Sequence, residues 1–370
     1  MEYLLNLIDT PGHVDFSHEV KRSLFISDGA ILLVDATQGV EAQTVSNFYT
    51  AFESDIGVIG AVNKIDMPAA RSEAVIRQMG ELFDIELDHI VPISAKTGLN
   101  TEKLFPMIID LLPPPKVETD APFQALLHDC QVHNAREMMI TAFIKSGVVS
   151  PRDMIYFIQS GVEYEVKEVG VFLPNPTPTE SLSAGQLGYL LINLKDISKV
   201  LIGDTICSPD NIQPQLLSCD KTKPVIFAGF YPDDEGDFIS LSSAIDKLTR
   251  SDTSVSLKPD SNYTLGKGWM LGFLGTLHMD VFSQRLEQDF STGVIATSPS
   301  ITYRAVMKDG TVKEFLDPME MPKEHRVLYY EEPMVLATLV VPFSCLSDVI
   351  AMCVERRGDQ KELIDLNFDR

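Results

Sequence analysis

The sequence is poor in cysteine, in long apolar runs and in positive charge. Its five cysteines are widely separated and include no Cys-x-x-Cys pair, which argues against a disulfide framework or a zinc knuckle. No apolar run approaches the roughly 18 residues that a membrane-spanning helix needs. Thirty Lys and Arg stand against 53 Asp and Glu, which gives a formal net charge of -23. Bulk binding to nucleic acid is therefore disfavoured, because neutralising phosphates needs concentrated basic residues, although a local basic face stays open.

The beginning of the chain also lacks a targeting signal. The first residues contain no Arg, no positively charged n-region and no Ser-rich presequence. Residues 4–8 are apolar apart from one Asn and predict a buried strand that the chain enters at once. With 370 residues, 45% of them hydrophobic and 22% charged, the chain has a globular composition. That length predicts roughly two to four domains.

The pattern of apolar runs changes three times along the chain. Residues 1–115 alternate short apolar runs with helical stretches, which predicts an α/β domain with a parallel sheet, and the three prolines at 113–115 end it. Residues 120–210 hold short strands separated by glycines and predict a β-barrel. Residues 222–300 predict an α+β domain of ferredoxin-like type, and residues 301–370 predict the incomplete start of a second α+β domain.

The first candidate motif is Asp9-Thr10-Pro11-Gly12-His13, between an apolar run and a predicted helix. Open α/β sheets present their ligand-binding groups at this carboxyl edge. An Asp at this place can hold a magnesium ion through water, and the amide of a Gly can approach a γ-phosphate without obstruction. A bare Asp-x-x-Gly is common, so this motif alone also fits a strand-ending turn.

Two further strand ends carry residue types that suit guanine, namely Asn63-Lys64-Ile65-Asp66 and Ser94-Ala95-Lys96. The Asp66 carboxylate can accept hydrogen bonds from guanine N1–H and from the exocyclic amine, for which adenine has no matching donors. The stem of Lys64 can lie along the base, and the backbone N–H of Ala95 can meet guanine O6. Each motif is weak alone. Three of them, in this order and each at a strand end, indicate a guanine-nucleotide domain.

These motifs resemble the third, fourth and fifth nucleotide motifs of translational GTPases, and residues 11–16 are typical of elongation factors. Within that superfamily the chain most resembles the LepA family of back-translocating elongation factors, in particular its mitochondrial branch. The resemblance spans nearly the whole chain and rests on residues 184–189, 203–205, 223–229 and, above all, 271–287, which differ from the corresponding segment of elongation factor G.

The resemblance implies GTP and GDP as ligands, Mg²⁺ as cofactor and GTP hydrolysis as the activity. It implies that Asp9 contacts the magnesium ion through water, that Gly12 senses the γ-phosphate and that His13 is the catalytic residue, which orients the attacking water. Positioning in place of covalent chemistry suffices for phosphoryl transfer. The remaining nucleotide-binding residues implied are Thr10, Pro11, Asn63, Lys64, Asp66, Ser94, Ala95 and Lys96.

The same resemblance implies a back-translocation or fidelity factor of mitochondrial protein synthesis. Its partners would be ribosomal RNA and ribosomal proteins, with transfer RNA bound through a C-terminal region beyond this chain. The expected location is the mitochondrial matrix, and peripheral attachment to the inner membrane stays open. His278, inside the segment 271–287, is expected to be a packed residue and not a ligand, and Phe273, Met279 and Phe282 are expected in the core.

The sequence contains no Gly-x-x-x-x-Gly-Lys-Ser/Thr loop, whose amides cradle a β-phosphate and whose hydroxyl binds magnesium. Members of the resembled family carry that loop. We therefore interpret residues 1–115 as a partial P-loop-type α/β GTPase domain in a chain incomplete at both ends. An incomplete or misassembled gene model is the simplest explanation, and a real loss of the loop stays open. We expect it to bind GTP barely, because several charge-assisted hydrogen bonds of about 1.5–3 kcal/mol each are missing. Two alternatives stay open: a truncated, non-hydrolysing ribosome-binding relative, and a forward-translocating factor like elongation factor G.

Overall fold

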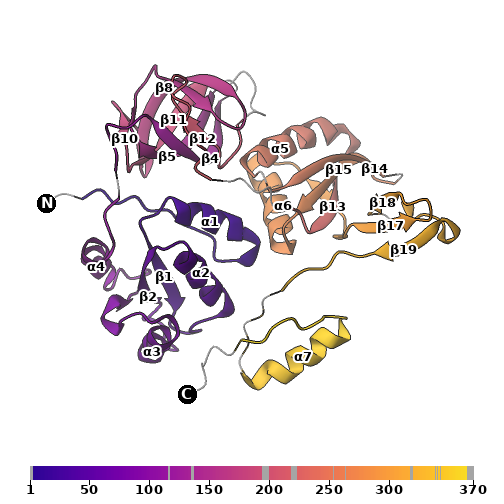
Figure 1. Cartoon of the computed structure of the whole chain (residues 1–370), viewed down its shortest axis with the longest axis horizontal. Helices are drawn as coiled ribbons and strands as arrows, with labels where there is room; N and C mark the ends of the chain where they lie inside the picture. Colours follow the sequence, from indigo (N-terminus) through magenta and orange to yellow (C-terminus); the bar gives the residue numbers. More distant parts are fainter. Residues whose placement is uncertain are drawn as a thin grey trace. The chain divides into compact units, whose positions relative to one another are not determined.

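The computed structural model describes the chain except residues 1–2, 116, 135–136, 194–199, 218–222, 253, 263, 317–319, 338, 340, 342 and 365–370. The chain divides into two compact units (Figure 1). The α/β unit consists of residues 10–115 with 335–370, and the second unit consists of residues 1–9 with 116–334. In the part of the chain that the structure describes, no helix is both long and apolar enough to cross a membrane.

The α/β unit is built on three parallel strands in the order β1 (Gly29–Asp35), β2 (Gly57–Asn63), β3 (Ile90–Pro92). The register pairs Asp35 with Asn63 and Val62 with Pro92. All three strands therefore end at one edge of the sheet, and the loops that follow them meet there. The βα alternation predicted for residues 1–115 is therefore present from residue 17 to residue 111.

Helices cover both faces of this sheet (Figure 1, indigo). They are α1 (Ser17–Phe25), α2 (Ala42–Glu53), α3 (Ser72–Phe83) and α4 (Leu104–Leu111). Helix α3 places Val75, Met79 and Phe83 at four-residue spacing, and these side chains form one core with α2 and with the face of the sheet that carries Val62. On the opposite face, Leu104 of α4 packs against the cluster of Ala61, Val91 and Ile93.

The strand predicted at residues 4–8 is wrong. Residues 3–12 form neither helix nor strand, and Leu4 and Leu7 are 59% and 87% exposed. A strand is stable only when a neighbouring strand satisfies its backbone N–H and C=O groups, and none of the described segments pairs with these residues. An apolar pattern fixes which face a strand would bury, but it does not supply the partner.

Residues 124–207 form the predicted barrel. Its main strands are β4 (Gln124–Asn134), β5 (Glu137–Ser146), β7 (Met154–Phe157), β8 (Val162–Leu173), β9 (Asn175–Thr179), β11 (Leu187–Asn193) and β12 (Thr205–Cys207), with β6 (Val148–Val149) and β10 (Leu182–Ser183) as a small separate pair. The sheet order β11-β5-β4-β12-β7-β8-β9 is closed by pairing of β11 with β8. At this closure a Cβ on Gly188 would lie 2.6 Å from the Gly170 carbonyl oxygen, so the seam requires glycine.

Residues 226–296 form the predicted ferredoxin-like arrangement. The elements are β13 (Ile226–Pro232), α5 (Phe238–Ser251), β14 (Ser256–Asn262), β15 (Gly266–Phe273), α6 (Thr276–Phe290) and β16 (Val294–Ala296). The sheet order is β14-β15-β13-β16, as expected for a β-α-β-β-α-β unit. Both helices contribute to one core, which contains Leu241, Ile245, Phe273, Phe282 and Leu286. The core positions predicted for Phe273 and Phe282 are confirmed, and Met279 packs against this core.

The last elements are a small antiparallel sheet and a helix. The sheet has the order β18 (Val312–Phe315), β17 (Tyr303–Met307), β19 (Val327–Glu331), and the helix is α7 (Leu346–Glu355). The apolar pattern of residues 333–341 predicts a further strand of this incomplete domain, but the described residues of that segment form neither helix nor strand, and Leu336 is 86% exposed. The bounds of the four domains that the sequence suggests stay predictions.

Candidate functional site

The loops after β1, β2 and β3 bring together most of the residues expected to bind guanine. Asn63 ends β2, and its side-chain Oδ1 accepts a hydrogen bond from the backbone N–H of Ala95 at 2.9 Å. The same oxygen accepts the backbone N–H of Lys64 at 2.8 Å. Asn63 therefore ties the loop after β2 to the loop after β3, which lies 32 residues further along the chain.

The Asn63 contact also holds an unfavourable backbone conformation. Lys64 has φ of 65°, in the left-handed region that residues with a Cβ seldom adopt. The hydrogen bond from the Lys64 N–H to Asn63 compensates part of that cost. The loop is thus fixed before any ligand arrives, as a site that must present side chains at set angles requires.

Ser94 fixes the carboxylate that was predicted to recognise the base. Its buried hydroxyl donates to Asp66 Oδ1 at 2.7 Å and accepts the backbone N–H of Thr97 at 3.2 Å. The Ser94 hydrogen bond is the main cause that holds the pKa of Asp66 below its ordinary value, and Lys96 contributes a smaller charge effect. Asp66 is therefore ionised and oriented, as an acceptor of two guanine N–H groups must be.

Lys64 lies in an ion pair that the sequence did not indicate. Its Nζ is 2.7 Å from Asp35 Oδ2. The other carboxylate oxygen of Asp35 accepts the backbone N–H of Thr37 at 2.7 Å and the Thr37 hydroxyl at 2.6 Å. The hydrogen bond from Lys64, followed by those from Thr37, lowers the pKa of Asp35 from 3.8 to about 2, and the same ion pair raises the pKa of Lys64.

One contact changes the expected role of Ala95. We expected its N–H to meet guanine O6, but in this structure that N–H donates to Asn63. Guanine O6 would have to compete with the Asn63 amide oxygen for it. Lys96, the residue after Ala95, is exposed, so a ligand can reach its side chain.

The Gly12-His13 turn is anchored separately, at the start of the short 3₁₀ turn η1 (Val14–Phe16). The Nδ1 atom of His13 accepts the backbone N–H of Asp15 at 3.2 Å. The Gly12 carbonyl accepts a hydrogen bond from the Asn47 side chain of α2 at 3.3 Å. A Cβ built on Gly12 would meet nothing within 4 Å, so the protein itself leaves open space there.

Two contacts orient the His13 ring. Its Nδ1 lies 3.2 Å from the backbone N of Asp15 and 3.6 Å from Asp15 Oδ1. These contacts engage the Nδ1 side of the ring. The side chain is 37% exposed, so the ring is accessible to water.

The remaining predicted residues are not brought into this arrangement by the contacts above. Asp9 groups with the second unit, while Thr10 and Pro11 begin the α/β unit in a stretch without helix or strand. Among the described residues, no group of three or more His, Cys, Asp or Glu side chains is placed to hold a metal ion. The magnesium role of Asp9 stays a prediction.

His278 has the packed position predicted for it. It is 2% exposed, its Nε2 lies 2.7 Å from Asp252 Oδ2, and its Nδ1 accepts the N–H of Leu274 at 3.3 Å. Burial acts to raise the pKa of Asp252, but the hydrogen bond and charge of His278 and the hydrogen bonds from Ser254 together hold it below the ordinary value. This group joins the segment before β14 to the start of α6.

Comparison with known proteins gives consistent results over the whole chain. Residues 1–114 match the family described as the elongation factor Tu GTP binding domain. The chain is 44% identical to the human protein named translation factor GUF1, mitochondrial, and 41% identical to an Arabidopsis thaliana homologue, with 100% of this chain and 56% of each relative covered. It is 40% identical to elongation factor 4 of Limosilactobacillus reuteri, over 97% of this chain and 59% of that protein. The chain therefore spans somewhat more than half of the length of these relatives.

The structural comparison concerns the fold alone. A crystal structure of a protein from Thermus thermophilus matches with a TM-score of 0.59 at 17% sequence identity, covering 81% of this chain and 58% of that chain.

Proposed function

We propose that the chain belongs to the LepA-type family of translation factors, whose relatives are named elongation factor 4 and GUF1. We further propose that it carries the guanine-recognising and hydrolysis-controlling residues of a GTPase that acts on the mitochondrial ribosome. The observation that carries the proposal is the cluster in which Asn63 holds Ala95 and Ser94 holds Asp66. These contacts join two strand ends into one preformed edge whose acceptors match guanine and not adenine.

Within this proposal each side chain has a defined task. Asp66 accepts the two N–H groups on the Watson–Crick edge of guanine, and the Lys64 stem lies against the face of the base. Gly12 leaves room for a terminal phosphate, and His13 orients the water that attacks that phosphate. Mg²⁺, held through water by Asp9, would neutralise phosphate charge when bound.

Base selectivity tests the guanine assignment directly. Because phosphate contacts are expected to be few, GDP, ADP and xanthosine diphosphate should be compared at millimolar concentration by ligand-observed NMR. GDP should give the strongest response. Asp66→Asn should lose the GDP response and gain one for xanthosine diphosphate, because the new amide donates where xanthine has a carbonyl in place of the guanine amine. Equal responses to GDP and ADP, or an unchanged preference in the variant, would contradict the assignment.

Nucleotide turnover tests the second half of the proposal. GTP hydrolysis should be measured with and without mitochondrial ribosomes for the chain and for His13→Ala. Ribosome-stimulated hydrolysis that falls by roughly 10²-fold or more in the variant supports His13 as the residue that positions water. Ribosome binding without hydrolysis would favour the alternative, a relative that binds ribosomes and does not turn over GTP. Unchanged hydrolysis in the variant would remove His13 from the mechanism.

The direction of movement on the ribosome is proposed from the family alone. We assign the chain to backward translocation because it resembles the LepA family, and to mitochondria because the human and Arabidopsis thaliana relatives are named mitochondrial. Mapping the codon position of stalled ribosomes before and after addition of the chain with GTP distinguishes the directions. A forward shift by one codon would support a role like that of elongation factor G.

A further inference from the structure

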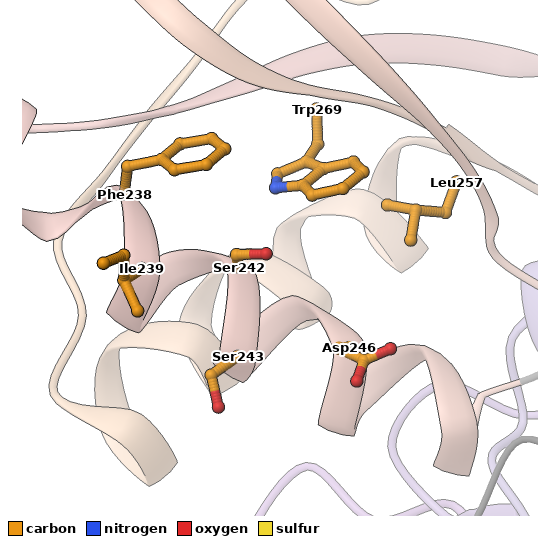
Figure 2. A pocket seen from close by; sticks show the side chains of 7 residues that line it. All are labelled: Phe238, Ile239, Ser242, Ser243, Asp246, Leu257 and Trp269. Atoms are coloured by element: carbon orange, nitrogen blue, oxygen red, sulfur yellow. The ribbon is translucent and has the colours of Figure 1, made fainter.

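A groove of about 380 Å³ lies between helix α5 and strands β14 and β15 of the second unit (Figure 2). Its size is at the low end of the roughly 300–1,000 Å³ of ligand-binding sites. None of the residues assigned to nucleotide binding lines it. The residues that line it are Phe238, Ile239, Ser242, Ser243, Asp246, Leu257 and Trp269.

The groove has an aromatic wall and an exposed apolar rim. The Phe238 and Trp269 rings are almost parallel, with centroids 6.4 Å apart and an interplanar angle of 6°. Ile239 is 81% exposed, although it stands next to the buried core of α5. Leu257 lies on β14, which is the edge strand of its sheet, so this end of the groove is not covered by a further strand. An isolated apolar residue is ordinary, but an apolar rim around a hollow marks an interaction surface.

The Trp269 side chain leaves a hydrogen-bond donor in the groove. Its Nε1 is buried and has no hydrogen-bond partner among the described residues. Figure 2 shows the indole nitrogen on the side of the ring that faces α5 and Ser242. An indole N–H is a donor only, and leaving it buried without an acceptor is unfavourable. A carbonyl oxygen of an occupant would satisfy it.

The acidic residues near the groove favour an occupant with positive charge. Asp246 is part of the wall, and Asp233, Asp234 and Asp237 precede or begin the helix that forms it. Residues 225–300 contain ten Asp and Glu against five Lys and Arg. A polyanion such as RNA would be repelled here, whereas a cationic segment would be attracted. A second copy of this chain, with the same net charge of -23, is also disfavoured.

We propose that the groove between α5 and β14 is a docking site for a basic segment of a protein partner. One large apolar side chain of that segment inserts beside Trp269 and against Ile239. A backbone carbonyl of the segment accepts the indole N–H, and its Lys or Arg side chains lie near Asp246 and Asp237. The apolar anchor supplies most of the affinity, and the acidic surroundings supply orientation and rejection of anions.

The chain contains one tryptophan, Trp269, which lines this groove, so selectively excited tryptophan emission responds to an occupant of the groove. The probe is a short peptide of alternating Leu and Lys without Trp or Tyr, titrated at low ionic strength. The comparison probes are the same peptide with Glu in place of Lys, and single-stranded oligouridylate. We expect a saturable blue shift of the emission with the Leu/Lys peptide only, weakened by added salt.

Two exposed positions give a matched pair of variants. Ile239→Lys places a positive charge on the rim and should weaken binding of the Leu/Lys peptide by roughly ten-fold or more. Val312→Lys makes the same kind of change at an exposed apolar residue of strand β18 and should leave binding unchanged. The proposal is overturned if the Leu/Lys peptide gives no saturable response, if both variants weaken it equally, or if only the acidic peptide or the RNA binds. None of these outcomes bears on guanine recognition, so the two proposals fail separately.

Discussion

The ion pair between Asp35 and Lys64 makes a sharp prediction about stability. Asp35→Asn keeps the size of the side chain and an oxygen that can accept from Thr37, but it removes the negative charge. The pKa of Asp35 is lowered from 3.8 to about 2 in the folded protein. A shift of that size corresponds to about 2.4 kcal/mol, at 1.36 kcal/mol per pH unit. Because the Lys64 side chain is 57% exposed, solvent screens part of this, and we expect a loss of about 1–2 kcal/mol at neutral pH.

The pH dependence has a defined sign. The folded-state pKa is below that of the unfolded chain, so the stabilisation is fully present above about pH 4 and is lost as the pH falls through the folded value. The difference between the original chain and Asp35→Asn should be complete at pH 7, roughly half as large at about pH 3, and nearly gone by about pH 1.

Amide hydrogen exchange is the suitable assay because the chain has two units and no single unfolding transition is assured. Peptides that cover β1 and β2 should exchange faster in Asp35→Asn, after correction for intrinsic rates at each pH. Asp88→Asn, at an exposed position of the same unit, is the control and should differ by less than about 0.5 kcal/mol. Equal exchange in the two variants, or a difference that does not shrink at pH 3, would refute the reasoning.

Three further predictions concern other contacts. Ser94→Ala should lower the free energy of local opening of the loop after β3 by about 1–3 kcal/mol, because Asp66 and the Thr97 N–H each lose a hydrogen-bond partner. It should also weaken GDP binding. Hydrogen exchange of residues 94–104 measures the first effect, and the NMR comparison measures the second. Gly188→Ala should destabilise the barrel by about 2 kcal/mol or more, because its Cβ would lie 2.6 Å from a backbone oxygen. Gly236→Ala is the control and should not destabilise the protein, because a Cβ there would meet nothing within 4 Å. Hydrogen exchange of peptides from the barrel distinguishes the two variants. His278→Leu should leave the Asp252 carboxylate short of a partner. It should also shift the emission of Trp269, because the His278 ring contacts Phe273 of the core against which Trp269 packs. An unchanged emission and unchanged exchange in α6 would contradict the third.

Much of the candidate site could be predicted because its residues lie at the ends of parallel strands. Asn63 and Ser94 end or follow neighbouring strands, and the parallel arrangement carries both to one edge of the sheet. The pattern could therefore place Asp66 and Ser94 together, although 28 residues separate them. The βαββαβ order also predicted the ferredoxin-like sheet, since that connection allows few arrangements.

Other contacts could not be predicted because the sequence pattern does not show which side chains pair with one another. Asp35 ends a strand just as Asn63 does, and this was the signal that could have identified it, but the pairing of its carboxylate with Lys64 depends on the register of β1 against β2. The use of the Ala95 N–H by Asn63 likewise depends on side-chain geometry. At residues 4–8 the sequence predicted a strand that is absent from the structure. The apolar pattern is that of a strand, but no described strand lies beside it to pair with its backbone.

The contacts that shape the guanine edge all lie within residues 35–97. Asn63 with Ala95, Asp66 with Ser94, and Lys64 with Asp35 use only side chains and amides of strands β1 to β3 and the loops that follow them. The cluster proposed to recognise the base is therefore organised independently of the residues proposed to contact phosphate, because no contact in this set involves the Gly12-His13 turn. Selectivity is a ratio of two affinities, and phosphate contacts common to GDP and ADP cancel from it. A chain that binds nucleotides weakly should consequently still prefer guanine, and the preference, more than the affinity, reports whether the proposed site is real.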